Sequence, residues 1–112
     1  MTAIAPQVQE TNLVGTIVNA AMSDVATTVQ VKFIDLKTGE AREPNAATKL
    51  FTFDKDNSKF EIILASSHST AGGVTTITVA TNGRGISTAD VTLTGSGTGN
   101  DHDVGAKVGC VS

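Results

Sequence analysis

The sequence has 112 residues and a net charge of −3, with four Phe and neither Trp nor Tyr. This length favours a single compact domain, and the shortage of large aromatic side chains predicts a thin core that a homo-oligomer would help to stabilise. The Lys and Arg residues are scattered, with no basic stripe, which argues against a nucleic-acid partner. The longest apolar runs, such as residues 62–65, are too short to span a bilayer, so no membrane partner is expected.

The N-terminal residues are polar and show no secretory signal. We interpret residues 1–12 as an extended arm that is disordered alone or laid on a partner, and residues 13–112 as a single β domain. Residues 13–19 predict a strand, and residues 19–26 are compatible with a helical turn. Cys110 is the only cysteine, which excludes an internal disulfide.

The clearest alternation of apolar and polar residues lies in residues 28–34. There Val29, Val31 and Phe33 fall on one face, and the intervening polar residues fall on the other. This pattern predicts a half-buried strand. The polar residues that follow, 37–45, predict a turn region.

Alternation resumes in residues 50–54, where Phe51 and Phe53 face one way. The next residues, 54–58, read DKDNS and predict a tight turn. Three apolar residues share a face in the strand expected after this turn: Phe60, Ile62 and Leu64. The two strands together predict a hairpin.

The C-terminal half holds several shorter elements. Residues 74–81 predict a strand with Ile77 and Val79 directed inward and Thr76 and Thr78 directed outward. The other elements expected in this half are a small-residue loop at 66–73, a short strand at 91–94, a mobile glycine-rich loop at 95–103 and a closing strand at 104–111.

These elements amount to six or seven short strands, and no segment predicts a long helix. Short strands separated by turns are typical of an all-β fold, either a compact sandwich or a small barrel. We therefore expect one of these two architectures, with an extended N-terminal arm.

The segment DKDNS begins like a calcium-binding loop, with Asp54, Asp56 and Ser58 at its first, third and fifth positions. The remaining positions do not fit, because Lys59 stands where the loop needs Gly and Ala65 stands where it needs a bidentate Glu. We therefore interpret the segment as a hairpin turn.

Other segments that could form a metal site, a phosphate-binding loop or a reactive thiol are also better explained as structural features. Residues 100–103 (NDHD) offer carboxylates and an imidazole, but neighbouring side chains in an extended loop point apart, so we favour a solvated loop over a metal site. The glycine-rich residues 95–99 lack the helix that follows a phosphate-binding loop. Cys110 is interpreted as a packed or incidental thiol. We expect no enzyme activity, no catalytic residue, no metal or other cofactor and no small-molecule substrate.

The segment VTTITVATNGRGIS, residues 74–87, places Arg84 between two glycines. Because Asn and Gly tolerate positive φ, the motif predicts a sharp corner after a strand. Arg84 could hold that corner by binding carbonyls or a carboxylate, or it could contact a partner subunit. We favour the corner.

The order of several short motifs resembles small β-domains of tailed-bacteriophage virion structural proteins of the tail, baseplate or fibre-attachment type. The motifs are FEIILASS at 60–67, TTITVATNGRG at 75–85 and HDVGAKVG at 102–109. Two features depart from the family pattern: Asn82 and Gly83 intervene before the Arg, and the spacer before His102 is long. The positions that match the family motif are candidate structural or interface residues: Glu61, Arg84, Gly85, His102, Gly105 and Val108.

The resemblance implies a virion component, made in the host cytoplasm, that acts through subunit–subunit contacts with other virion proteins and performs no catalysis. An alternative place is the capsid surface, as a decoration (cement) protein. A third hypothesis is a carbohydrate-binding or adhesin module, which the absence of Trp and Tyr makes less attractive.

Overall fold

The computed structural model describes residues 12–45, 48–54, 58–86 and 98–111. In this part of the chain all regular structure is β, and every strand pairing is antiparallel. The strands are β1 (Leu13–Ile17), β2 (Thr28–Asp35), β3 (Leu50–Phe53), β4 (Glu61–Ala71), β5 (Val74–Val79) and β6 (Lys107–Val111). The all-β prediction is therefore confirmed.

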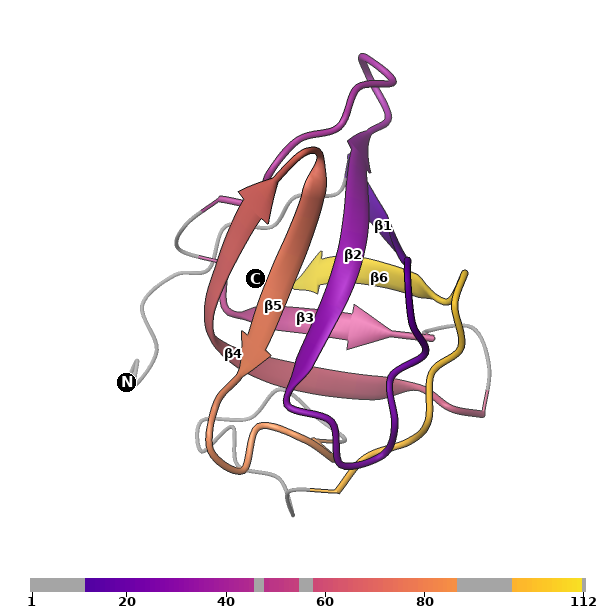
Figure 1. The fold of residues 1–112 in the computed structure, drawn as a ribbon, viewed down its shortest axis with the longest axis vertical. Helices are drawn as coiled ribbons and strands as arrows, with labels where there is room; N and C mark the ends of the chain where they lie inside the picture. Colours follow the sequence, from indigo (N-terminus) through magenta and orange to yellow (C-terminus); the bar gives the residue numbers. More distant parts are fainter. Residues whose placement is uncertain (1–11, 46–47, 55–57, 87–97, 112) are drawn as a thin grey trace.

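The strands close into a barrel in the order β1-β2-β5-β4-β3-β6 (Figure 1). Strand β6 pairs with both β1 and β3, so the closing strand expected within residues 104–111 is confirmed. Figure 1 shows β2 and β5 side by side, with β3 and β6 crossing behind them at a steep angle. The expected N-terminal arm, except for Asn12, and the expected strand at 91–94 lie outside the described residues. Within the described part of the chain, no helix is long and apolar enough to cross a membrane.

The inward faces predicted from alternation are confirmed. The side chains of Val29, Val31 and Phe33 in β2 are buried, as are those of Phe51 and Phe53 in β3. The predicted inward residues of β5 are buried too: Ile77 and Val79. These residues form one core cluster inside the barrel, in which the rings of Phe33 and Phe51 lie 6.0 Å apart.

The predicted hairpin is confirmed by the pairing of β3 with β4, but the face shared by Ile62 and Leu64 is the outer one. There these two side chains pack with Leu50 and Ile86 in a second apolar cluster. The opposite face of β4 turns Glu61 and Ile63 into the barrel. Alternation alone could not choose between the faces, because both carry apolar residues.

The loop expected at residues 66–73 is wrong for most of this segment, because β4 continues as a strand through Ala71. A bulge between Ala65 and Ser67 bends the strand, and the segment then pairs with β5 along its whole length. Only Gly72 and Gly73 form the turn, with φ of 60° and 81°, which suits a two-residue hairpin. The small polar residues of this segment do not alternate with apolar ones, so the sequence pattern did not predict a strand. The segment is a strand because it pairs with β5.

The helical turn considered for residues 19–26 is also wrong. This segment is an irregular connection between β1 and β2, and Met22 forms a bridge pair with His102. Asn19 has a φ of 71°, a conformation incompatible with a right-handed helix. The turn region at 37–45 is confirmed, with Gly39 at a φ of 75°.

The inward face of β4 can be tested by truncating Ile63. Ile63 is fully buried, so Ile63→Ala should lower the free energy of unfolding by about 2–5 kcal/mol through lost burial and a cavity. The control is Leu64→Ala on the outer, half-buried face, which should cost clearly less. Urea unfolding followed by circular dichroism measures both, and equal losses would contradict the assigned faces.

Candidate functional site

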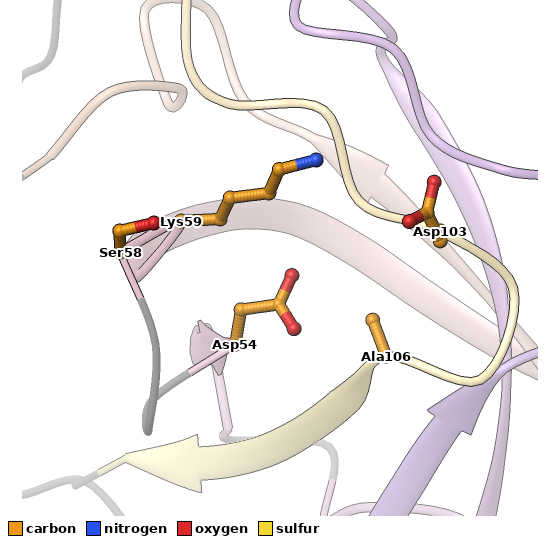
Figure 2. A pocket seen from close by; sticks show the side chains of 5 residues that line it. All are labelled: Asp54, Ser58, Lys59, Asp103 and Ala106. Atoms are coloured by element: carbon orange, nitrogen blue, oxygen red, sulfur yellow. The ribbon is translucent and has the colours of Figure 1, made fainter.

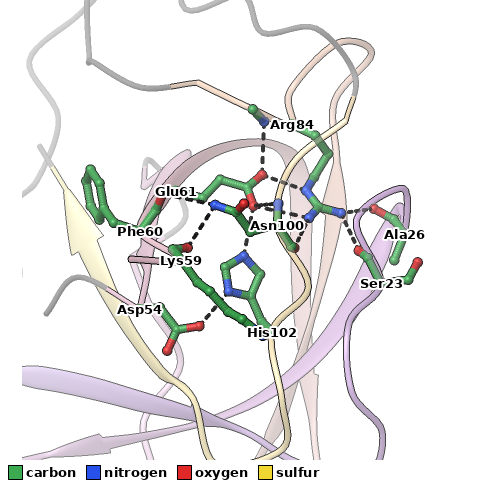
Figure 3. A network of polar contacts seen from close by, with 10 residues as sticks. Ser23, Ala26, Asp54, Lys59, Phe60, Glu61, Arg84, Asn100 and His102 are labelled. Carbon is green, nitrogen blue, oxygen red and sulfur yellow. Dashed lines mark hydrogen bonds and ion pairs between the residues drawn. The ribbon is translucent and has the colours of Figure 1, made fainter. Parts of the chain in front are cut away.

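Arg84 lies at the centre of a buried polar network at one end of the barrel (Figure 3). It belongs to the corner after β5, and its side chain is 2% exposed. Its Nε donates to Glu61 Oε2 at 2.7 Å and its Nη2 donates to Glu61 Oε1 at 3.1 Å. This two-pronged geometry is the strong form of an Arg–carboxylate pair.

The remaining guanidinium donors of Arg84 bind backbone carbonyls from distant segments. Nη1 donates to the carbonyl oxygens of Ser23 and Ala26, both at 2.9 Å, in the connection between β1 and β2. Nη2 also donates to the carbonyl of Asn100 at 2.9 Å. Every N–H of the guanidinium is thus used inside the chain, so Arg84 holds the corner as favoured from the sequence.

Glu61 is the first residue of β4 and points into the barrel end, where it is 2% exposed. Besides Arg84, its carboxylate accepts the backbone N–H groups of Gly85 and Asn100, each at 2.9 Å. A Cβ atom on Gly99 would collide with this carboxylate, so the close approach of the 98–100 segment requires glycine. Burial by itself raises the pKa of Glu61, but the hydrogen bonds from His102, Arg84 and the two backbone groups outweigh it and hold the pKa well below its ordinary value of 4.5.

His102 joins Glu61 to a second carboxylate. Its Nε2 lies 2.8 Å from Glu61 Oε1 and its Nδ1 lies 2.6 Å from Asp54 Oδ2, while its ring packs on Phe53. Burial alone lowers the pKa of His102, but its hydrogen bonds and charge attraction to Glu61 and Asp54 prevail and raise the pKa above 6.5. A protonated ring donates from both nitrogens, which matches two carboxylate partners.

The burial of His102 corrects the solvated loop expected for residues 100–103. Its neighbours Asp101 and Asp103 are exposed as expected, whereas His102 is fully buried and Asn100 is half-buried. Asn100 also donates from its side chain to the carbonyls of Lys59 and Phe60. The loop is drawn inward because Glu61 and Arg84 need these partners.

Four of the six positions matched by the resemblance meet in this network: Glu61, Arg84, Gly85 and His102. The other two lie apart from it. Gly105 forms the turn before β6 with a φ of 95°, and Val108 is a buried core residue paired with Gly15 and Phe53.

Sequence reasoning missed Asp54 and Asn100 as members of the network. The hairpin register offered a signal for Asp54, because Phe53 pairs with Glu61 and Asp54 therefore follows at the same barrel end. Its φ of 53° turns the chain there. No comparable signal marks Asn100, whose contacts with Glu61 and Arg84 are made by its backbone N–H and carbonyl.

The network reaches the surface at Asp54, which is 12% exposed. There a hollow of about 380 Å³ is lined by Asp54, Ser58, Lys59, Asp103 and Ala106 (Figure 2). Behind Asp54, the polar groups of His102, Glu61 and Arg84 bind one another and backbone groups. Within the described ranges no three His, Cys, Asp or Glu side chains are placed to hold a metal ion. The arrangement is suited to fastening the connection between β1 and β2, the start of β4, the corner and residues 98–102 together.

No family model, no curated protein and no solved structure matches this chain.

The anchoring role of Arg84 predicts a large loss of stability on its removal. Arg84→Ala leaves the buried Glu61 without its main counter-charge and should cost about 3–5 kcal/mol of unfolding free energy. The control is Arg42→Ala, which removes a pair with Asp35 at the surface and should cost clearly less. Thermal melts of both variants check this; an unchanged melting temperature for Arg84→Ala would refute the anchor.

Stability should also depend on pH on both sides of a plateau. The lowered pKa of Glu61 gives stabilisation that is present above its ordinary 4.5 and lost as pH falls below it. The raised pKa of His102 gives stabilisation that is present below 6.5 and lost as pH rises through its higher folded value. The groups that face this histidine are Asp54 and Glu61, with Arg84 beyond.

Urea unfolding from about pH 2 to pH 9 covers both sides of this plateau. His102→Gln should remove the decline on the alkaline side and weaken the acid decline, which persists because Arg84 and two backbone N–H groups still bind the Glu61 carboxylate. An alkaline decline that persists in this variant would assign it to other groups.

Proposed function

We propose that this protein is a structural component of a tailed-bacteriophage virion that acts by subunit–subunit contacts in the tail, at the baseplate or a fibre attachment. The observation that carries the proposal is the meeting of Glu61, Arg84, Gly85 and His102 in one buried network. These are positions on which the resemblance to virion β-domains rests. The contacts among these residues fix the loops at one end of the small barrel, which would explain why the motifs occur together.

The chemistry of the network supports a role without catalysis. A catalytic acid, base or nucleophile needs a group that can reach a substrate. Here Glu61 and His102 are buried, and their polar atoms are occupied by Arg84, Asp54 and backbone groups. A rigid domain that presents shaped ends to neighbours fits this arrangement better than an enzyme does.

The aromatic residues speak against the adhesin hypothesis. Sugar-binding sites commonly stack aromatic rings on the ligand, so they need rings at the surface. Three of the four Phe residues are buried, and Phe60 is 37% exposed. This surface offers little for ring stacking.

The test is to locate the protein in particles of the phage that encodes it. Peptide mass spectrometry of gradient-purified virions should detect the chain at structural-protein abundance, and immunogold labelling should place it on the tail. A non-virion enzyme from the same lysate provides the negative control. Label on the head would instead favour the decoration role, and absence from purified virions would refute both.

A further inference from the structure

The upper half of β4 forms an open edge in an otherwise closed barrel. Strand β4 pairs with β3 only from Glu61 to Leu64, and the last link on that side is the N–H of Ala65 bound to the carbonyl of Lys49. Beyond the bulge the strand turns away from β3 and continues beside β5 alone, as Figure 1 shows. Within the described ranges, the segment from Ser66 to Ala71 has no strand on its β3 side.

The register identifies which backbone groups face this edge. Ala71 and Val74 close a two-residue turn, so they form a hydrogen-bonded pair, and Ser69 pairs with Thr76 in the same way. The alternate residues, His68 and Thr70, therefore direct their N–H and C=O groups away from β5. The described residues supply no backbone partner for either.

Beyond the bulge, this edge carries none of the side chains that usually discourage pairing. Natural edge strands carry Lys, Pro or inward charges that discourage an added strand. The segment SSHSTA, residues 66–71, has none of these, and its outward side chains Ser67, Ser69 and Ala71 are exposed and small. A further strand can therefore approach it closely.

His68 provides a second, independent sign that a partner is missing here. Its side chain is 3% exposed, and among the described residues neither ring nitrogen has a hydrogen-bond partner. The carboxylate oxygen Oε1 of Glu43 lies 3.7 Å from Nδ1, and the ring makes an edge contact with Phe51. Buried polar groups without partners are costly and rare, so this one marks a place where a polar contact is to be supplied.

The N-terminal segment of the chain starts from the same end of the barrel. The carbonyl of Asn12 accepts the N–H of Leu36, and the following turn brings Ala41 into a bridge with Ile34. A Cβ on Gly73, at the tip of the β4–β5 hairpin, would lie 3.7 Å from that of Ala41. Asn12, which follows the N-terminal segment, and the open edge of β4 therefore lie at the same end of the barrel.

The chemistry and reach of residues 2–10 suit this edge. They read TAIAPQVQE, with one charge, an apolar Val8 between two glutamines and amides that can bind an imidazole. In an extended conformation these residues span about 30 Å, at roughly 3.3 Å per residue. This length is similar to the dimensions of the molecule, 34 × 30 × 25 Å, so the segment is long enough to reach a neighbouring subunit. Strand β1 lies opposite β4 in the barrel order, so a chain's own segment would spend part of this length crossing the barrel end.

We propose that residues 2–10 of a neighbouring copy add as a strand to the open β4 edge at His68 and Thr70, and so link subunits. This inference rests on the proposed function, whose subunit contacts it specifies. Main-chain hydrogen bonds to the edge supply the affinity, as in other strand-addition complexes. The link is heterologous, so repeated copies build a ring or a fibre.

Two matched lysine variants of the full chain test the edge. Ser69 and Thr76 are cross-strand neighbours in the β4–β5 pair, but only Ser69 lies on the edge strand. In sedimentation equilibrium, Ser69→Lys should weaken self-association by about tenfold or more, whereas Thr76→Lys should change it by less than about twofold. Amide exchange at His68 and Thr70 should slow on association of the unaltered chain. Equal effects of the two lysines, or no self-association of the unaltered chain, would overturn the proposal.

Disulfide trapping identifies the occupant. In a Cys110→Ser background, the chains carrying Val8→Cys and Ser69→Cys are mixed and oxidised gently, and a mixed dimer is expected. Dimers of Ser69→Cys with itself would show β4-to-β4 pairing instead, and a cross-link only within the doubly substituted chain would show self-docking; either result overturns the proposal. These measurements need no virion, so they fail or succeed independently of the particle test.

Discussion

The buried ion pair between Arg84 and Glu61 is the interaction on which one end of the barrel depends. Removing two charges from water costs several kcal/mol for each ion, and their attraction repays this only if the remaining donors and lone pairs also find partners. The carbonyls of Ser23, Ala26 and Asn100 and the N–H of Gly85 meet that demand. The connections at this end therefore take their course because the pair requires their backbone groups.

The same pair compensates for a core with few large side chains. Among the described residues Arg84 is the largest of the fully buried side chains, and it fills the space between Glu61 and the carbonyls that it binds. An apolar filling of similar volume could be equally stable, but it would not define which carbonyl lies where. The hydrogen bonds of Arg84 and Glu61 have defined directions, so they specify how the loops are arranged at this end of the barrel. Alternation of apolar residues and burial do not determine that arrangement.

Sequence patterns predicted the fold where one strand face is apolar and the other polar. In β2 and β3 the burial of Phe33, Phe51 and Phe53 follows from simple alternation. In β4 the pattern failed, because both faces are apolar near Ile62 and Ile63 and the later residues owe their strand conformation to β5.

The network was predictable only in part, through the resemblance that selected Glu61, Arg84 and His102. The inward turn of Glu61 violates the rule that charges stay outside, and it becomes reasonable only once its partners are known. Asp54 and Asn100 were not assigned to the network because their contribution depends on their tertiary position, for which the hairpin register gave a signal only in the case of Asp54.

The sequence separations within the network have a consequence for the order of folding. Arg84 binds groups 23, 58 and 61 positions earlier and 16 positions later in the chain. Contacts of such long range form only after the entropy of closing the intervening loops has been lost, so the network should assemble late, around a barrel already drawn together. Interactions absent from the transition state slow unfolding more than they speed folding. The main effect of the ion pair would then be to slow the unfolding of the closed barrel.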